Sequence, residues 1–300
     1  MSTSPARPAA VRGTLDDVVA LLAGRRLTAL TGAGVSTDSG IPDYRGPDSP
    51  PRTPMTFQQF VGDEAFRRHY WARNHVGWRH VHETHPNAGH RALAALEERG
   101  VVLGVVTQNV DLLHEAAGSR NVIDLHGRYD RVVCLRCRTV YPRAVLAERL
   151  EALNPGFVER VGGEVGDVEI APDADAVIER TADFRVQACW APDPDDRSRP
   201  CGGILKPDIV YFGENVPRER VERAYAMVDA ADALLVAGSS LSVQSGLRFV
   251  RHAAQAGKPV VVVNRGETRG DRWATLTLHT GTSELLAALV SLLPALPRDA

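Results

Sequence analysis

Five short apolar runs recur along this chain of 300 residues, and each is followed directly by a polar or glycine-containing cluster. Short runs with β-branched residues are typical of buried strands. In an open parallel sheet, ligands bind beyond the carboxyl ends of the strands. The pattern therefore predicts a doubly wound α/β fold with a binding site at that edge. The runs are 27–30, 101–106, 121–124, 233–237 and 259–263, and the clusters are 31–45, 107–111, 125–127, 238–240 and 264–266.

The first cluster begins with a turn of small residues, Gly32, Ala33 and Gly34. Such residues leave room for a dinucleotide diphosphate to approach the backbone. The plain dinucleotide fingerprint is GxGxxG, and Thr37 stands here at its third glycine, so the glycines alone are weak evidence. A hydride-transferring dehydrogenase would also need an acidic ribose ligand about twenty residues further on. That region, 50–54, reads PPRTP, which argues against a dehydrogenase.

Charge and hydropathy exclude several other classes of protein. The net charge is −2 and no stripe of Lys or Arg runs along the chain, so no specific nucleic-acid surface is expected. No apolar stretch reaches the ~18 residues that a membrane helix needs, and the N-terminus has no apolar core of the secretory kind. We expect a cytoplasmic protein without membrane contact and a disordered tail over 1–13. The sequence does not indicate an oligomeric state.

Four cysteines form a separate signal. Cys134 and Cys137 are a CxxC pair, whereas eleven residues separate Cys189 from Cys201. In a cytoplasmic protein such a set favours zinc over disulfides. A four-cysteine zinc site is closed and tetrahedral, so it would stabilise the fold and not catalyse. The long second spacing leaves four reduced, metal-free thiols as the alternative.

The same segments resemble the signatures of the sirtuin family, the NAD-dependent protein lysine deacylases. In chain order they are GAGVSTDSGIPDYRG, TQNVDLLHEAAGS, DLHG, CLRC, CGGILKPDIVYFGE, GSSL and VNRG. The resemblance extends from about Leu15 to Leu293. The block YWARNHVGW over 70–78 resembles the class II branch more specifically.

The resemblance implies an α/β fold: a Rossmann-like parallel sheet with helices on both faces, a small zinc-binding module and a helical insertion. The Rossmann-like domain would comprise 14–127 and 207–300, with a cofactor loop and helical insertion at 46–86. The zinc-binding module would comprise 128–206. Within these parts we expect a helix that Thr14 caps, followed by helices over 57–78, 91–98, 218–230 and 283–293.

His126 is the predicted catalytic base. It follows a strand, Gly127 leaves its ring approachable, and an ordinary imidazole pKa of about 6.5 suits proton transfer near neutral pH. The resemblance implies that His126 deprotonates a ribose hydroxyl of NAD and that Asn109 and Asp111 act beside it. Turn chemistry is the alternative for these two residues. The implied NAD contacts are Gly32, Ala33, Gly34, Ser36, Asp43, Tyr44, Arg45, Gln108, Asn109, Asp111, Gly238, Ser239, Ser240, Asn264 and Gly266.

Two further sets of residues concern the substrate. By resemblance, an acyl-lysine peptide adds to the strand edge at Val210, Phe212, Gly213 and Glu214 through backbone pairing, where a merely buried strand is the alternative. Tyr70 and Arg73 share one helix face at i and i+3. Sirtuins selective for succinyl and malonyl groups use such a Tyr-x-x-Arg pair to hold the distal carboxylate. Plain helix packing, with Arg73 in solvent, is the alternative reading.

The function implied is NAD-dependent removal of an acyl group from protein lysine, producing nicotinamide, O-acyl-ADP-ribose and free lysine. No GxSxG nucleophile elbow is present, so NAD itself would supply the electrophile. Protein mono-ADP-ribosylation is an alternative that uses the same electrophile. A catalytically silent NAD-binding interaction module is another, and the presence of Asn109, Asp111 and His126 argues against it.

Overall fold

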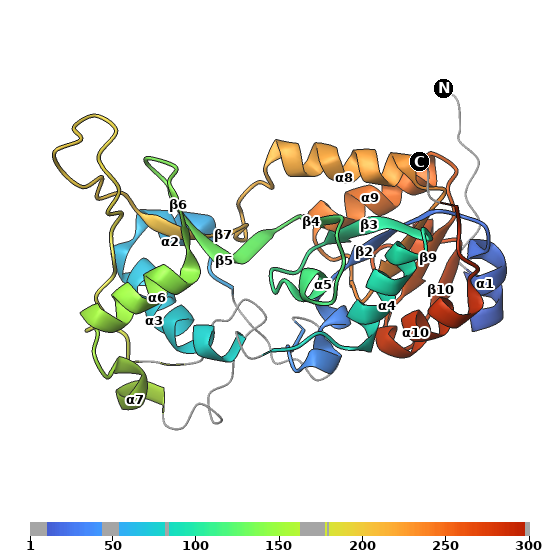
Figure 1. The fold of residues 1–300 in the computed structure, drawn as a ribbon, viewed down its shortest axis with the longest axis horizontal. Coiled ribbons are helices and arrows are strands. Elements are labelled where there is room, and N and C mark those ends of the chain that lie inside the picture. The colour runs from blue at the N-terminus through green and yellow to red at the C-terminus, as the bar shows by residue number, and fades with distance from the viewer. Residues whose placement is uncertain (1–10, 44–53, 82–83, 163–177, 179, 298–300) are drawn as a thin grey trace.

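A computed structural model describes residues 11–43, 54–81, 84–162, 178 and 180–297. Within these ranges the strands form two sheets, a larger parallel sheet and a smaller antiparallel one (Figure 1). The larger sheet has the order β1-β10-β9-β8-β2-β3-β4, and the smaller one has the order β6-β5-β7.

Five of the seven strands described in the larger sheet, β2, β3, β4, β8 and β9, match the predicted apolar runs, whereas β1 and β10 were not predicted. β2 lies at the centre of this sheet and pairs in parallel with β3 on one side and β8 on the other. From β2 the chain continues to β3 and β4 in one direction, and β8, β9 and β10 extend in the other. Such a reversal of strand order opens a crevice for ligands at the carboxyl ends. The strands are β1 (Val11–Arg12), β2 (Leu27–Thr31), β3 (Val102–Thr107), β4 (Val122–Asp124), β8 (Ala233–Ala237), β9 (Val260–Val263) and β10 (Leu276–Leu278).

Helices cover both faces of this sheet, as predicted (Figure 1). Successive side chains of a strand point to opposite faces. Leu235 of β8 accordingly joins the core beneath α1, α4 and α10, and its neighbours Leu234 and Val236 join the core beneath α8 and α9. The helices are α1 (Leu15–Leu22), α4 (Ala88–Glu98), α5 (Leu113–Ala116), α8 (Arg218–Ala230), α9 (Gln244–Gln255) and α10 (Thr282–Leu292).

The smaller sheet packs with the helical insertion. Phe60 and Trp71 from the insertion share one buried cluster with Val132, Leu205 and Tyr211 from the sheet and the loop that follows it. This packing fixes the insertion beside the chain that leaves the sheet at Ile209. The elements are β5 (Gly127–Cys134), β6 (Val140–Pro142), β7 (Leu205–Ile209), α2 (Phe57–Gly62), α3 (Glu64–Val81), α6 (Arg143–Leu153) and α7 (Phe157–Gly162).

The structure bears on three local predictions: the cap of the first helix, a single helix over 57–78 and a disordered tail. Thr14 caps α1 through a reciprocal capping box with Asp17, as predicted. The single helix expected over 57–78 is wrong, because the chain breaks at Asp63, whose carboxylate accepts a hydrogen bond from the Ala65 backbone at 2.7 Å. The disordered tail expected over 1–13 is wrong for Val11 and Arg12, because the exposed edge of β10 offers them backbone partners. Residues 1–10 lie outside the described ranges.

No helix in the described ranges is both long enough and apolar enough to span a bilayer.

Candidate active site

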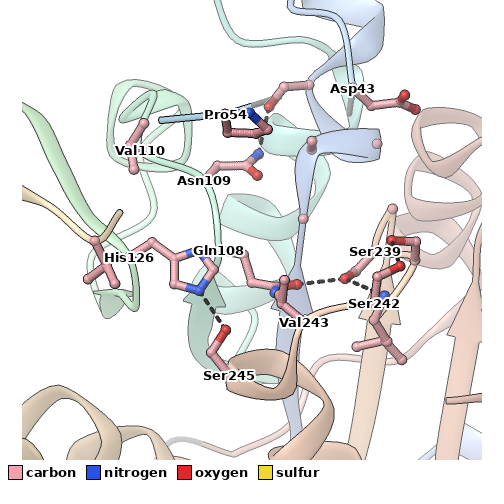
Figure 2. A pocket seen from close by; sticks show the side chains of 18 of the residues that line it. Asp43, Pro54, Gln108, Asn109, Val110, His126, Ser239, Ser242, Val243 and Ser245 are labelled. Atoms are coloured by element: carbon pink, nitrogen blue, oxygen red, sulfur yellow. Dashed lines mark hydrogen bonds between the residues drawn. The ribbon is translucent and has the colours of Figure 1, made fainter. Parts of the chain in front are cut away.

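One cavity of about 1020 Å³ lies where the loops that follow β2, β3, β8 and β9 meet. Its size is at the upper end for small-molecule sites, so it has room for a large ligand. Figure 2 shows His126 facing the start of α9, with Gln108 and Asn109 on the same side of the cavity as His126. The predicted residues that line it are Gly32, Ala33, Gly34, Ser36, Asp43, Gln108, Asn109, Asp111, His126, Val210, Phe212, Gly213, Glu214, Gly238, Ser239, Ser240, Asn264 and Gly266.

The glycines after β2 and β8 are required by contact between the two loops. The Gly34 backbone N–H donates to the Gly238 carbonyl at 2.8 Å. A Cβ on Gly34 would lie 2.9 Å from the Gly238 backbone, and one on Gly238, whose φ is +64°, would lie 2.3 Å from the Val35 nitrogen. The approach of a diphosphate was the expected reason for this small-residue turn. The structure adds that the two loops must first fit against each other.

A polar centre forms the floor of the cavity. Ser36 Oγ donates to Asp111 Oδ2 at 2.7 Å and accepts from Asn109 Nδ2 at 3.0 Å. Burial raises the pKa of Asp111, and hydrogen bonds from the Leu113 backbone and Ser36 oppose that shift. His90 Nε2 lies 3.3 Å from Ser36 Oγ. The Asn87 backbone N–H donates to His90 Nδ1, so in the neutral ring Nε2 carries the proton and donates to Ser36.

Buried histidines beneath this floor make folding stability depend on pH. His114 is 1% exposed, and burial, followed by the effect of His90, lowers its pKa from 6.5 to about 3. Between those values the unfolded chain binds a proton at His114 that the folded chain does not. Stability therefore falls as the pH falls through this window, by about 2 kcal/mol from His114 alone at pH 5.

We expect His114→Gln to lose less stability than the wild type between pH 7 and pH 5. Glutamine does not titrate, and its amide can still bond to Thr31, whose hydroxyl lies 2.9 Å from His114 Nε2. The free energy of unfolding, measured with denaturant at both pH values, checks this. His279→Gln, at an exposed position, is the control. An unchanged difference between the two pH values in His114→Gln would contradict the expectation.

His126 lies between β4 and β5, and its position is fixed by its neighbours. Its carbonyl accepts from the Val210 backbone at 2.7 Å, and Gly127 has a φ of +90° with no room for a Cβ beside Asp208. Its Nε2 lies 2.8 Å from Ser245 Oγ (Figure 2).

The surroundings of His126 keep its ring neutral at pH 7. Burial lowers the pKa of His126 to about 4, a hydrogen bond with the Gln108 backbone opposes this, and the charges of Arg220 and Arg248 lower the pKa further. Because one ring nitrogen bonds to the backbone, Nε2 is left to accept the Ser245 hydroxyl proton. A neutral ring with an accepting nitrogen in the cavity is the form that a general base requires.

Sequence reasoning missed α9 and therefore missed Ser245. This residue lies 119 positions beyond His126, and no local pattern connects the two. One signal was available. In a doubly wound fold a helix usually follows each strand, so the first turn of a helix after the cluster 238–240 would lie at the same edge of the sheet. Arg248, one turn further along α9, lines the cavity for the same reason.

The wall over 209–214 is held by a buried lysine. Lys206 is 4% exposed, and its Nζ donates to Glu214 Oε2 at 3.0 Å and to the Ile209 carbonyl. The same Glu214 oxygen accepts from the Tyr211 backbone at 3.0 Å. The Phe212 carbonyl accepts from the Phe57 backbone at 2.9 Å, so α2 supports the wall from outside.

Tyr70 and Arg73 are not brought into the cavity. Tyr70 is 1% exposed and packs edge-on against Phe60 and Tyr211, with centroid distances of 5.4 Å in both pairs. Arg73 contacts His69, one turn back on the same helix. The two residues share a helix, but neither lines the cavity as the structure describes it. The described structure buries Tyr70 in the aromatic cluster, so the role of this pair in reading a distal carboxylate stays a prediction without support from the cavity lining.

Two predicted NAD contacts, Tyr44 and Arg45, lie outside the described residues. The same holds for the part of the predicted cofactor loop up to residue 53.

The four cysteines converge on one point. Their sulfur atoms all lie within 4.8 Å of one another, and the closest pairs are Cys137–Cys189 at 3.6 Å and Cys134–Cys201 at 3.8 Å. Zn–S bonds of about 2.3 Å in a tetrahedron place neighbouring sulfurs about 3.8 Å apart. The donor set therefore fits zinc, and such an ion would connect the β5–β6 turn to the chain that precedes β7.

The long spacing between Cys189 and Cys201 is accommodated by an ordered loop. Pro192 and Pro200 form an antiparallel bridge, and the buried Asp193 carboxylate pairs with Arg136 at 3.0 Å and Arg199 at 3.2 Å. Tyr141 Oη lies 3.1 Å from Cys189 Sγ and can support a metal-bound thiolate from outside the first coordination shell.

Comparison with known proteins gives a consistent result. The profile of the Sir2 family matches residues 32–245. The chain is 63% identical to NAD-dependent protein deacetylase 1 of Mycobacterium avium, over 95% of this chain and 98% of that protein. It is 54% identical to NAD-dependent protein deacetylase 1 of Streptomyces coelicolor, over 82% of this chain and 78% of that protein.

Solved structures agree in fold. A Sir2 homologue in complex with NAD aligns with a TM-score of 0.68 at 29% identity, covering 95% of this chain and 96% of that one. A complex of Sir2 with a p53 peptide and NAD⁺ aligns with a TM-score of 0.67 at 28% identity, covering 93% and 98%. From the profile match and the identities over most of its length, this chain belongs to the Sir2 family, the sirtuins.

Proposed function

We propose that this protein is an NAD-dependent protein-lysine deacetylase, or deacylase, which releases nicotinamide, O-acyl-ADP-ribose and free lysine. The observation that carries the proposal is the neutral His126 ring in a cavity formed at the strand ends, in a chain 63% identical to an NAD-dependent protein deacetylase. We further propose that it belongs to the class II branch, on the strength of the block over 70–78, and that it acts in the cytoplasm.

The cavity residues fit NAD and an acyl-lysine together. The Gly34 and Gly238 loops keep the backbone close to the cavity, where a diphosphate has few side chains to avoid. When bound, NAD supplies a labile glycosidic bond and hence the electrophile for the acyl oxygen. Asn109 and Asp111 offer an amide and a carboxylate at the floor, held in place by Ser36. With NAD bound, His126 Nε2 would exchange the Ser245 hydroxyl for a ribose hydroxyl as its partner and would take up the ribose proton.

A direct assay tests this function. The purified protein is incubated with NAD and an acetyl-lysine peptide, and the products are weighed by mass spectrometry. We expect loss of the acyl mass from the peptide together with nicotinamide and O-acetyl-ADP-ribose. Addition of ADP-ribose to the protein substrate without loss of the acyl group would favour mono-ADP-ribosylation instead, and an absence of any NAD consumption would contradict the proposal.

We expect Lys206→Met to raise the KM for the peptide about ten-fold and to leave the KM for NAD unchanged. Methionine removes the charge-assisted bonds to Glu214 and Ile209 that shape the peptide wall. Steady-state kinetics with each substrate varied in turn check this. Lys206→Arg, which keeps the charge, is the matched variant and should lose less. A rise in the KM for NAD alone would contradict the assignment of this wall to the peptide.

A further inference from the structure

Two cations that the chemistry above does not use line the cavity, Arg248 and Arg265, and Arg265 pairs with Asp38 at 3.3 Å. Arg248 lines the cavity and is half-buried. Its Nε donates to the Gln244 carbonyl at 3.4 Å, within its own helix. Across the described residues no carboxylate pairs with it. Arg220, the other guanidinium near His126, differs in this respect, because it pairs with Asp208 at 2.9 Å.

The position of Arg248 assigns it to the acyl-lysine end of the cavity. It lies three residues after Ser245, so the two side chains share one face of α9. Ser245 contacts His126 directly, and the charge of Arg248 is close enough to that ring to lower its pKa. The Gly34 loop, where a diphosphate is expected, follows β2, and the Gly238 loop precedes α9, whereas Arg248 lies one turn inside that helix.

The start of α9 adds to the positive potential on the side of the cavity that Arg248 lines. Val243 caps the helix without a side-chain hydrogen bond, and it lines the cavity with Gln244 and Ser245. The first N–H groups of a helix carry a partial positive charge and attract anions. Of the acids that line the cavity, Asp111 is bonded to Ser36 and Glu214 to Lys206, whereas Asp43 and Glu267 lie on the loops after β2 and β9.

We propose that Arg248 is a specificity-determining residue that binds a carboxylate of the acylated substrate. The carboxylate is either the distal group of a dicarboxylic acyl chain or the side chain of an Asp or Glu next to the acyl-lysine. The proposal rests on the deacylase function proposed above. A guanidinium can grip a carboxylate through two parallel charge-assisted bonds, and a half-buried site weakens screening by salt.

Three peptides of one sequence test this role and separate the two sources. The first carries acetyl-lysine between neutral residues, the second carries succinyl-lysine there, and the third carries acetyl-lysine beside a glutamate. We expect the wild type to favour one acidic peptide over the neutral one in kcat/KM. Arg248→Met should reduce that preference about ten-fold or more. The peptide that loses the preference identifies the source of the carboxylate.

Two further variants make the comparison specific. Arg248→Lys keeps the charge but not the paired geometry, so it should retain part of the preference. Arg251→Met removes the same charge from an exposed position on α9 outside the cavity and should leave the preference unchanged. Thermal melting curves confirm that each variant is folded before its kinetics are compared.

Several outcomes would overturn the role of Arg248. One is an absence of acid preference in a wild type that turns over the neutral peptide. Another is an equal loss on all three peptides in Arg248→Met, and a third is a higher KM for NAD with every peptide, which would assign the residue to the cofactor. A wild type that deacylates none of the peptides would instead refute the proposed function, and the role of Arg248 would fall with it.

Discussion

Replacing His126 with alanine is expected to lower the kcat for deacylation about 10²–10⁴-fold, the usual effect of losing a general base. The ring nitrogen that faces the cavity, Nε2, is the proton acceptor that the reaction needs, and alanine offers none. The fold should survive, because His126 holds the wall over 209–214 through its backbone carbonyl, which alanine retains. Much of the affinity for NAD should survive too, since the glycine loops are untouched.

Rapid-quench or steady-state kinetics at saturating NAD and peptide measure the loss, and calorimetric titration measures NAD binding. The matched control is His252→Ala on α9, which removes an imidazole outside the cavity whose contacts are Asp229 and the ring of Tyr225. A His126→Ala enzyme that keeps more than about half of the wild-type rate would remove His126 from the mechanism. A variant that has lost NAD binding as well would show that the histidine acts mainly in binding.

Cys134→Ser is expected to release the bound zinc and to cause the largest loss of stability among the changes considered. Cys134 is fully buried at the junction of the four thiols, and three ligands hold zinc far less well than four. Zinc binding contributes about 10–16 kcal/mol in zinc-finger peptides, where it is coupled to folding. Cys134→Ser would lose a large part of the free energy that zinc binding contributes to folding. The three-stranded sheet should unfold first.

Metal analysis of carefully prepared wild-type protein comes before the mutant and should find about one zinc per chain. Thermal melting of Cys134→Ser should then match that of wild type stripped with a chelator. Arg197→Ala, on the exposed part of the loop between Cys189 and Cys201, is the control and should keep both zinc and stability. Less than about a tenth of an equivalent in the wild type would refute the site and leave four reduced thiols.

Much of the fold and most of the cavity could be predicted because their signals are local. A buried strand is a short apolar run, and polar residues just after it must lie at its carboxyl end. Parallel strands place those ends along one edge, so the sequence predicts that Ser36, Asn109 and His126 lie together, as they do in the cavity. The cysteine cluster was predictable in part, since a CxxC pair with two further cysteines favours a common metal, although the eleven-residue spacing left metal-free thiols as an alternative.

What the sequence did not decide depends on which surfaces pack together. Helical periodicity places Tyr70 and Arg73 on one face but does not say what that face meets, and the aromatic cluster around Phe60 buries Tyr70 away from the cavity. Ser245 contacts a histidine 119 positions earlier because α9 packs on the sheet. The sequence by itself determined strands β2, β3, β4, β8 and β9 of the larger sheet, their ligand-binding edge and the chemical groups placed there. The tertiary structure alone decided which helix faces line the cavity, because the burial of apolar surface between distant segments sets helix orientation and leaves no local pattern in the chain.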